Sequence, residues 1–161
     1  MTDSSRHDAL GQALAVAQLR AWRTSLLALH KVLVDNELSR YAAAFGPVGG
    51  PHNALRLLSD NPWFQWLRPL LVTIVQIDER LADNRPLAGE ELDTFRRETR
   101  ALLQPLPDTP HGREYQRSLQ ELPAAVVIHG KLLALLKEQA PELTSRPQPG
   151  VEGPAPRAGS E

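Results

Sequence analysis

Apolar residues recur every three or four positions along most of the chain, which is the spacing of one face of an α-helix. In the first stretch, residues 5–44, the recurring apolar positions are Leu19, Trp22, Leu26, Leu29, Leu33 and Tyr41. No stretch before residue 140 shows the strict alternation of apolar and polar residues that predicts a half-buried strand. The pattern therefore predicts an all-α fold that begins with one long helix.

Proline and glycine mark where the helices end. Gly46–Pro51 ends the first helix, and Asn61 is placed to cap a new helix whose first residue is Pro62. Pro69 predicts a kink, or a short helix over 62–67 followed by a restart. Further helices are expected over residues 51–58, 62–82, 89–104 and 112–139, the last with an interruption near Pro123. Four main amphipathic helices and one short extra helix favour an antiparallel four-helix-bundle-like domain.

The two ends of the chain depart from this pattern. Residues 141–161 hold five prolines, three glycines and only four apolar residues, so we expect a disordered tail. The bundle is expected to be one domain over residues 1–140, with residues 1–8 frayed. Residues 9–21 of the first helix are predicted to overhang the bundle, where two copies could pair as a homodimer.

Composition narrows the classes of protein that such a fold serves. The chain has 161 residues, 42% of them hydrophobic and 23% charged, which is enough to build a core. The 18 Lys and Arg nearly balance the 19 Asp and Glu, so we expect neither nucleic-acid nor acidic-membrane binding. The absence of cysteine excludes disulfides, a cysteine nucleophile and thiolate metal sites. With no apolar run of about 18 residues and no signal-peptide pattern, a cytoplasmic protein is predicted.

Four ionisable side chains fall on the apolar faces of the expected helices: His30, Glu37, Asp78 and His129. Burying an unpaired charge costs several kcal/mol, so we expect them to pair, to shift their pKa, to bind something or to lie at an edge. Imidazoles and carboxylates are ligands for zinc, iron or manganese, which makes a metal site one hypothesis. The sequence has no Glu-x-x-His, however, and His30 lies about 10.5 Å from Glu37 along a helix, which is unfavourable for one mononuclear centre.

The same four residues allow two other interpretations. The favoured one is a buried network in which His30 or His129 donates to Asp78 or Glu37, with Tyr41 one turn from Glu37. The other is a pocket for an organic ligand or for acid–base catalysis. No activated serine or cysteine accompanies the histidines, so no catalytic residue is assigned, no cofactor is predicted and a non-enzymatic protein is favoured.

Three aromatic residues, Trp63, Phe64 and Trp66, lie within four positions and cannot all share one helix face. The favoured interpretation is packing in the core and beneath the short helix 51–58. The other interpretation is that an exposed Trp63 or Trp66 anchors a protein partner.

The most specific string in the chain is Asp60-Asn-Pro-Trp-Phe-Gln-Trp-Leu-Arg-Pro-Leu70. It is preceded by Leu29-His-Lys31, Asp35-Asn-Glu37 and Tyr41, and followed by Ile77-Asp-Glu79. Together these residues resemble a family of short bacterial all-helical proteins, over roughly residues 30–130. The resemblance implies a single helical domain and, because no activity is known for that family, it implies no catalytic roles.

The sequence thus predicts a small non-enzymatic cytoplasmic protein that binds an unknown protein partner or a small ligand. The alternative is a metal-binding or acid–base site inside the bundle, built from His30, Glu37, Asp78 and His129.

Overall fold

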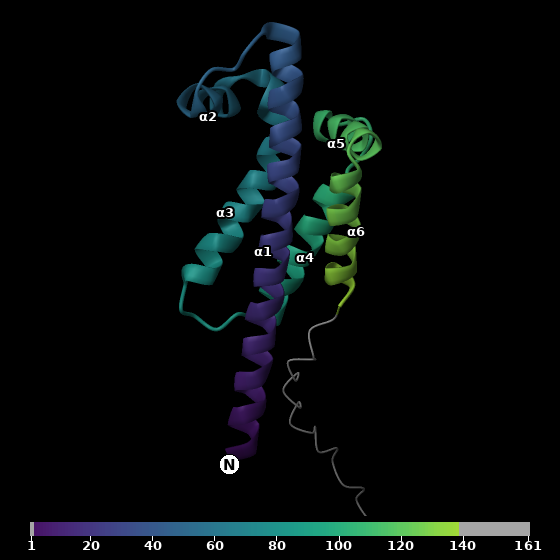
Figure 1. The fold of residues 1–161 in the computed structure, drawn as a ribbon. Coiled ribbons are helices and arrows are strands. Elements are labelled where there is room, and N and C mark those ends of the chain that lie inside the picture. The colour runs from purple at the N-terminus through teal and green to yellow at the C-terminus, as the bar shows by residue number, and fades with distance from the viewer. Residues whose placement is uncertain (1, 139–161) are drawn as a thin grey trace, which may run out of the picture.

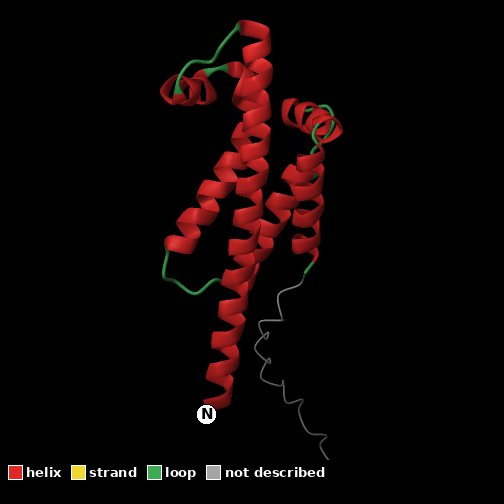
Figure 2. Ribbon diagram, in the orientation of Figure 1, coloured by secondary structure: helices red, strands yellow, loops and turns green. Residues whose placement is uncertain are grey.

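The structure, a computed structural model, describes the backbone of residues 2–138 and the side chains of residues 5–138. Within this range it has six α-helices, one 3₁₀-helix and no strand (Figures 1 and 2). The elements are α1 (Thr2–Phe45), α2 (Pro51–Asp60), η1 (Pro62–Leu67), α3 (Arg68–Ala82), α4 (Gly89–Leu103), α5 (Pro110–Glu121) and α6 (Pro123–Lys137). The all-α prediction is confirmed, and the tail predicted for residues 141–161 lies outside the described residues.

Helix α1 is the axis around which the other helices pack. Its 44 residues extend about 66 Å at 1.5 Å per residue. Helices α3 and α6 flank α1, and α4 closes the arrangement by contacting both of them. Because α1, α3, α4 and α6 run alternately up and down, the predicted antiparallel four-helix arrangement is present (Figure 1).

The core lies where α1 meets its neighbours. The side chains that α1 buries completely are Ala15, Leu19, Trp22, Leu26, Leu29 and Leu33. Their spacing follows the periodicity predicted from the sequence, and each buried leucine contributes about 1.5–3 kcal/mol relative to an exposed one. Tyr41, the last position of the predicted stripe, is only half-buried because α1 there runs beyond the four-helix core toward α2 and η1.

Proline sets the breaks between elements, as the sequence predicted. The Asn61 side chain accepts a hydrogen bond from the Trp63 backbone N–H at 2.9 Å and caps η1. Pro69 lies in the first turn of α3, where its missing N–H costs least, so the chain passes directly from 3₁₀ to α geometry at Arg68. Pro123 divides the last helical region into α5 and α6, and α5 begins at Pro110, slightly earlier than predicted.

Taken one at a time, the helices within residues 2–138 are too short or too polar to cross a membrane. Helices α5 and α6 meet the length and composition requirements only when they are counted together, and the chain bends by 114° between them.

The N-terminal overhang of α1 is shorter than predicted. The helix already begins at Thr2, and Ala15 and Leu19 are completely buried. The Gln12 side chain also donates to the Leu87 carbonyl at 2.9 Å and accepts from the Leu87 N–H at 2.8 Å. Of residues 9–21, the first turn or two therefore project from the bundle (Figure 1). The homodimer stays a prediction.

Helix α2 is the element most loosely joined to the rest. It buries none of its residues, and it packs mainly against η1 (Figure 1). The loop before it turns through two glycines in the left-handed region, Gly46 at φ +94° and Gly49 at φ +84°, a conformation that L-residues rarely adopt.

Candidate functional site

The four ionisable residues predicted to face the core do not come together. Glu37 on α1, Asp78 on α3 and His129 on α6 each bind a different partner, whereas His30 borders a cavity. Among residues 2–138 no three His, Asp or Glu side chains are close enough to hold a metal ion. The structure therefore assembles neither the predicted metal site nor the predicted histidine–carboxylate network within that range.

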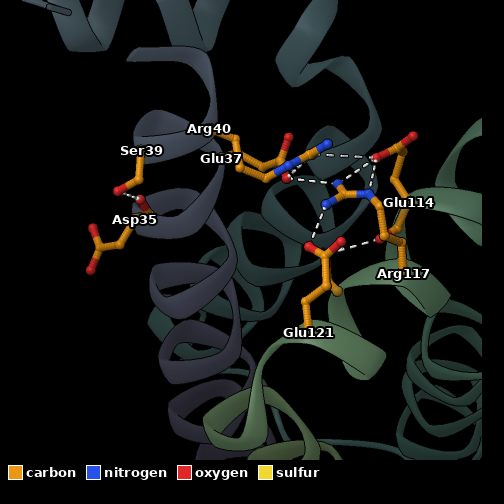
Figure 3. Close-up of polar contacts among 8 residues, drawn as sticks. Asp35, Glu37, Ser39, Arg40, Glu114, Arg117 and Glu121 are labelled. Carbon is orange, nitrogen blue, oxygen red and sulfur yellow. Dashed lines mark hydrogen bonds and ion pairs between the residues drawn. The ribbon is translucent and has the colours of Figure 1, made fainter. Parts of the chain in front are cut away.

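Glu37 is the one member of the four that is buried, with 1% of its surface exposed. Its Oε1 atom accepts hydrogen bonds from Arg40 Nη1 at 2.9 Å and from Arg117 Nη2 at 2.8 Å (Figure 3). Arg40 lies one turn away on α1, whereas Arg117 comes from α5. The carboxylate thus gains two charge-assisted hydrogen bonds, which compensate for its loss of water.

Arg117 extends this cluster along α5. It also pairs with Glu114 and, through Nη1 at 2.9 Å, with Glu121 (Figure 3). Glu114, Arg117 and Glu121 follow the three- and four-residue spacing at which charged side chains meet on one helix face. That spacing could have identified Arg117 as a partner of Glu114 and Glu121, but not of Glu37 on α1. The cluster joins α5 to α1 through Glu37.

Asp78 lies at an edge of the bundle rather than in its core. Its two carboxylate oxygens accept from Arg23 Nε at 2.7 Å and Arg23 Nη2 at 3.1 Å. Both side chains are partly open to solvent. The prediction of a core-facing Asp78 is wrong because its face of α3 meets α1 along a solvent-lined seam.

His129 pairs with a buried tyrosine instead of a carboxylate. Its Nδ1 lies 2.9 Å from the Tyr115 hydroxyl. Burial lowers the pKa of His129 and raises the pKa of Tyr115, so both groups favour their neutral forms. The pair is a neutral hydrogen bond between α5 and α6, which is a structural role.

His30 differs from the other three because no hydrogen bond joins its ring to another residue in the described part of the chain. Burial lowers its pKa, so the neutral imidazole is favoured. The ring borders a cavity of about 360 Å³ between α1, α2, η1 and α3, which we call the α2 pocket.

The α2 pocket has mostly apolar walls. Its apolar lining residues are Val34, Leu55, Leu58, Phe64, Leu67 and Leu71. Its polar lining residues are His30, Ser59, Gln65 and Arg68. An apolar cavity of this size with a few polar groups has the form of a small-molecule site. Of the four residues for which the sequence analysis offered a ligand pocket, His30 alone lines this one. The rest of the pocket could not be predicted, because it depends on how α2 lies beside α1, η1 and α3.

The two predicted partner-binding tryptophans are unequally accessible. Trp66 is only 6% exposed and belongs to the core. Trp63 is half-buried, with its ring edge-to-face against Tyr41 and Phe45 and with the Arg40 guanidinium over it. Of the two, Trp63 is the residue that reaches the surface.

His111, in the first turn of α5, has a structural role. Its Nδ1 lies 2.8 Å from the Trp66 carbonyl and its Nε2 lies 3.0 Å from the Leu102 carbonyl. The ring thereby joins α5 to η1 and to the C-terminal turn of α4.

Comparison of the chain with family models, with curated proteins and with solved structures found no match. The resemblance to a bacterial helical family therefore stays a prediction from the motif residues.

Proposed function

We propose that this is a small, non-enzymatic ligand-binding protein that takes an apolar molecule into the α2 pocket. The observation that carries the proposal is the pocket itself, a cavity of about 360 Å³ with six apolar lining residues. The pocket is open to solvent at Leu55 and Leu71, so its apolar side chains stay in contact with water, which costs about 25 cal/mol per Å² of apolar surface. An occupant that removes those side chains from water would offset that cost.

The surroundings of the pocket support the same proposal. Leu55 on α2 and Leu71 on α3 line it and are still 63% and 45% exposed. Continuing along the α1–α3 seam, Leu27 and Val75 are also exposed, and the Arg23–Asp78 pair lies one turn further. An apolar strip thus leads out of the pocket. Exposed apolar surface that adjoins a cavity is typical of a ligand-binding groove.

Binding is favoured over catalysis by the polar groups of the pocket. His30 is its one general-base candidate, and no carboxylate lines the pocket to orient or charge that imidazole. Ser59 donates to the Leu55 carbonyl at 3.0 Å, which directs its hydroxyl hydrogen to its own helix. We also propose a cytoplasmic location, as the sequence predicted.

The test is binding of an uncharged apolar fluorophore, N-phenyl-1-naphthylamine, to the full chain. We expect saturable one-site binding that Leu71→Glu weakens at least tenfold, since it places a carboxylate in the pocket wall. The matched control is Val72→Glu, at the next residue of α3, which is equally exposed at 45% but does not line the pocket. Absence of saturable binding, or equal losses in both variants, would overturn the proposal.

A second candidate function, docking of a protein partner, is favoured by the aromatic cluster at the end of α1. Phe45 is 65% exposed and packs against both Tyr41 and Trp63, at centroid distances of 4.8 and 5.6 Å. Exposed aromatic residues are common anchors of protein interfaces. Phe45→Ser would then abolish co-purification of a partner with the tagged full chain, while Leu106→Ser, at another strongly exposed residue, would not.

A further inference from the structure

We infer that the ligand of the α2 pocket is a single-chain amphiphile with a carboxylate head, a long-chain monocarboxylate, whose head pairs with Arg68. This inference rests on the proposed function and adds the chemical class of the ligand. It is carried by the charge of the pocket lining and by the shape of the apolar surface that leads out of it.

The charge of the lining favours an anion. Arg68 is the one arginine among the lining residues, and no Asp or Glu lines the pocket. The closest acidic residues along α1 and α2, Asp35 and Asp60, lie outside the lining, and Asp35 is already paired with Lys31 at 2.7 Å. A positive group next to an apolar cavity complements a ligand with one negative charge.

Arg68 is also free to bind such a head group. Within residues 2–138 it takes part in no salt bridge, and its side chain makes one long hydrogen bond, to Gln65 Oε1 at 3.5 Å. By contrast, Arg23 on the same seam is fully engaged by both oxygens of Asp78. A guanidinium presents two parallel N–H donors to a carboxylate, so Arg68 can bind a carboxylate head in this way.

The apolar surface fits one alkyl chain better than a compact ligand. From Leu71 the exposed apolar positions continue through Val75 and Leu27, and the strip ends at the Arg23–Asp78 pair. Leu71 and Asp78 are seven residues apart, which is about 10.5 Å along α3. Val75 on α3 and Leu27 on α1 extend the strip along the seam, with Val72 one turn from Val75 on α3, and an elongated apolar surface of this kind fits a hydrocarbon chain lying along the helices.

The neutral imidazole of His30 lies in the same pocket and does not oppose the anion. Apart from Arg68, no charged side chain lines the pocket from α1, α2, η1 or α3. A carboxylate beside His30 would favour its protonated form, which adds a second favourable charge to the bound state.

The experiment compares three twelve-carbon ligands on the full chain by isothermal titration calorimetry below their micelle concentrations. The ligands are dodecanoate, dodecanol and dodecyltrimethylammonium. We expect dodecanoate to bind at least tenfold more tightly than dodecanol, and the cationic ligand to bind most weakly. Equal affinity for dodecanoate and dodecanol, or preference for the cation, would overturn the inference.

Two variants assign the head-group contact. Arg68→Met should lower the affinity for dodecanoate about tenfold and change the affinity for dodecanol less than twofold, because it removes the charge and keeps an apolar side chain. The matched control, Arg56→Met on the exposed face of α2, lies outside the pocket lining and should change neither ligand. An affinity for dodecanoate that is unchanged in Arg68→Met would contradict the inference.

Failure of the proposed function and failure of the carboxylate assignment give different results. If neither dodecanol nor the uncharged fluorophore binds, the α2 pocket is not a ligand site and the proposed function fails. If both bind but dodecanoate has no advantage, the pocket is a ligand site and the carboxylate assignment alone fails.

Discussion

His30 and Glu37 lie two turns apart on the same helix and meet opposite surroundings. Glu37 is closed in by two arginines, one from its own helix and one from α5. His30 borders an open cavity, and in the described part of the chain nothing hydrogen-bonds its ring. Two charge-assisted hydrogen bonds give Glu37 an architectural role. The His30 ring faces a space that a ligand can fill, which suits it to binding.

The largest expected effect is a loss in the free energy of unfolding when Glu37 is replaced. Glu37→Gln keeps the volume of the side chain but removes the charge that two guanidiniums face. Breaking a buried ion pair from one side typically costs about 3 kcal/mol or more of the free energy of unfolding. Urea unfolding followed by circular dichroism measures the loss.

The matched control for Glu37→Gln is Asp35→Asn on the solvent face of the same helix. Asp35 pairs with Lys31 in a salt bridge in which both side chains are well exposed, so its removal should cost under about 0.5 kcal/mol. Similar losses in the two variants would mean that the Glu37 cluster does not hold α5 to α1.

A smaller loss in the free energy of unfolding is expected for a substitution at the seam between α1 and α3. Asp78→Asn removes the bidentate contact with Arg23, but both side chains are partly exposed. Ion pairs of this kind contribute about 0.2–1 kcal/mol, and salt screens them. The same unfolding experiment at low and high salt should show a small loss that shrinks with salt. A loss as large as that of Glu37→Gln would place Asp78 in the core after all.

The pH dependence of the free energy of unfolding tests the burial of His30 and His129. Burial lowers the pKa of His30 and His129 below the ordinary 6.5, so below that pH the unfolded chain binds protons more readily than the folded one. Their stabilising contribution is therefore complete above about pH 6.5 and is lost as the pH falls. The urea concentration at the unfolding midpoint should decrease as the pH falls from 7.5 to 5. In His129→Asn this midpoint should change less steeply with pH. An unchanged slope in that variant would contradict the burial of His129.

The smallest effect is expected at His30 itself. His30→Leu removes a group that forms no hydrogen bond in the described residues and whose charged form is opposed by burial. We expect the free energy of unfolding to stay within about 1 kcal/mol or to rise, since apolar area is added beside apolar walls. A loss of 2 kcal/mol or more would show that His30 has a structural partner and would remove the contrast with Glu37.

The sequence predicted those features of the fold that depend on a single helix and its ends. Proline, asparagine and glycine placed the breaks at Asn61, Pro69 and Pro123, because capping and the missing proline N–H act within a few residues. The apolar stripe of α1 was also predictable, since it depends on helical periodicity alone.

The partners of the polar residues were not predictable in the same way. A helical wheel correctly placed Glu37 inward, but it could not show that Arg117 would arrive from a helix 80 residues later. It put Asp78 inward because it cannot distinguish the centre of a helix interface from its solvent-lined edge. The α2 pocket depends on where a loosely packed helix comes to lie, which no local pattern encodes.

The central claim is that the α2 pocket binds a ligand while the Glu37 cluster only holds the helices together. Methyl ¹H–¹³C spectra of the full chain titrated with dodecanoate test it directly. We predict saturable shifts concentrated in the methyl groups of Val34, Leu58 and Leu71, with the exposed methyl groups of Val126 and Val127 on α6 unchanged. Shifts that appear first on α6, or no shifts at millimolar dodecanoate, would contradict the account.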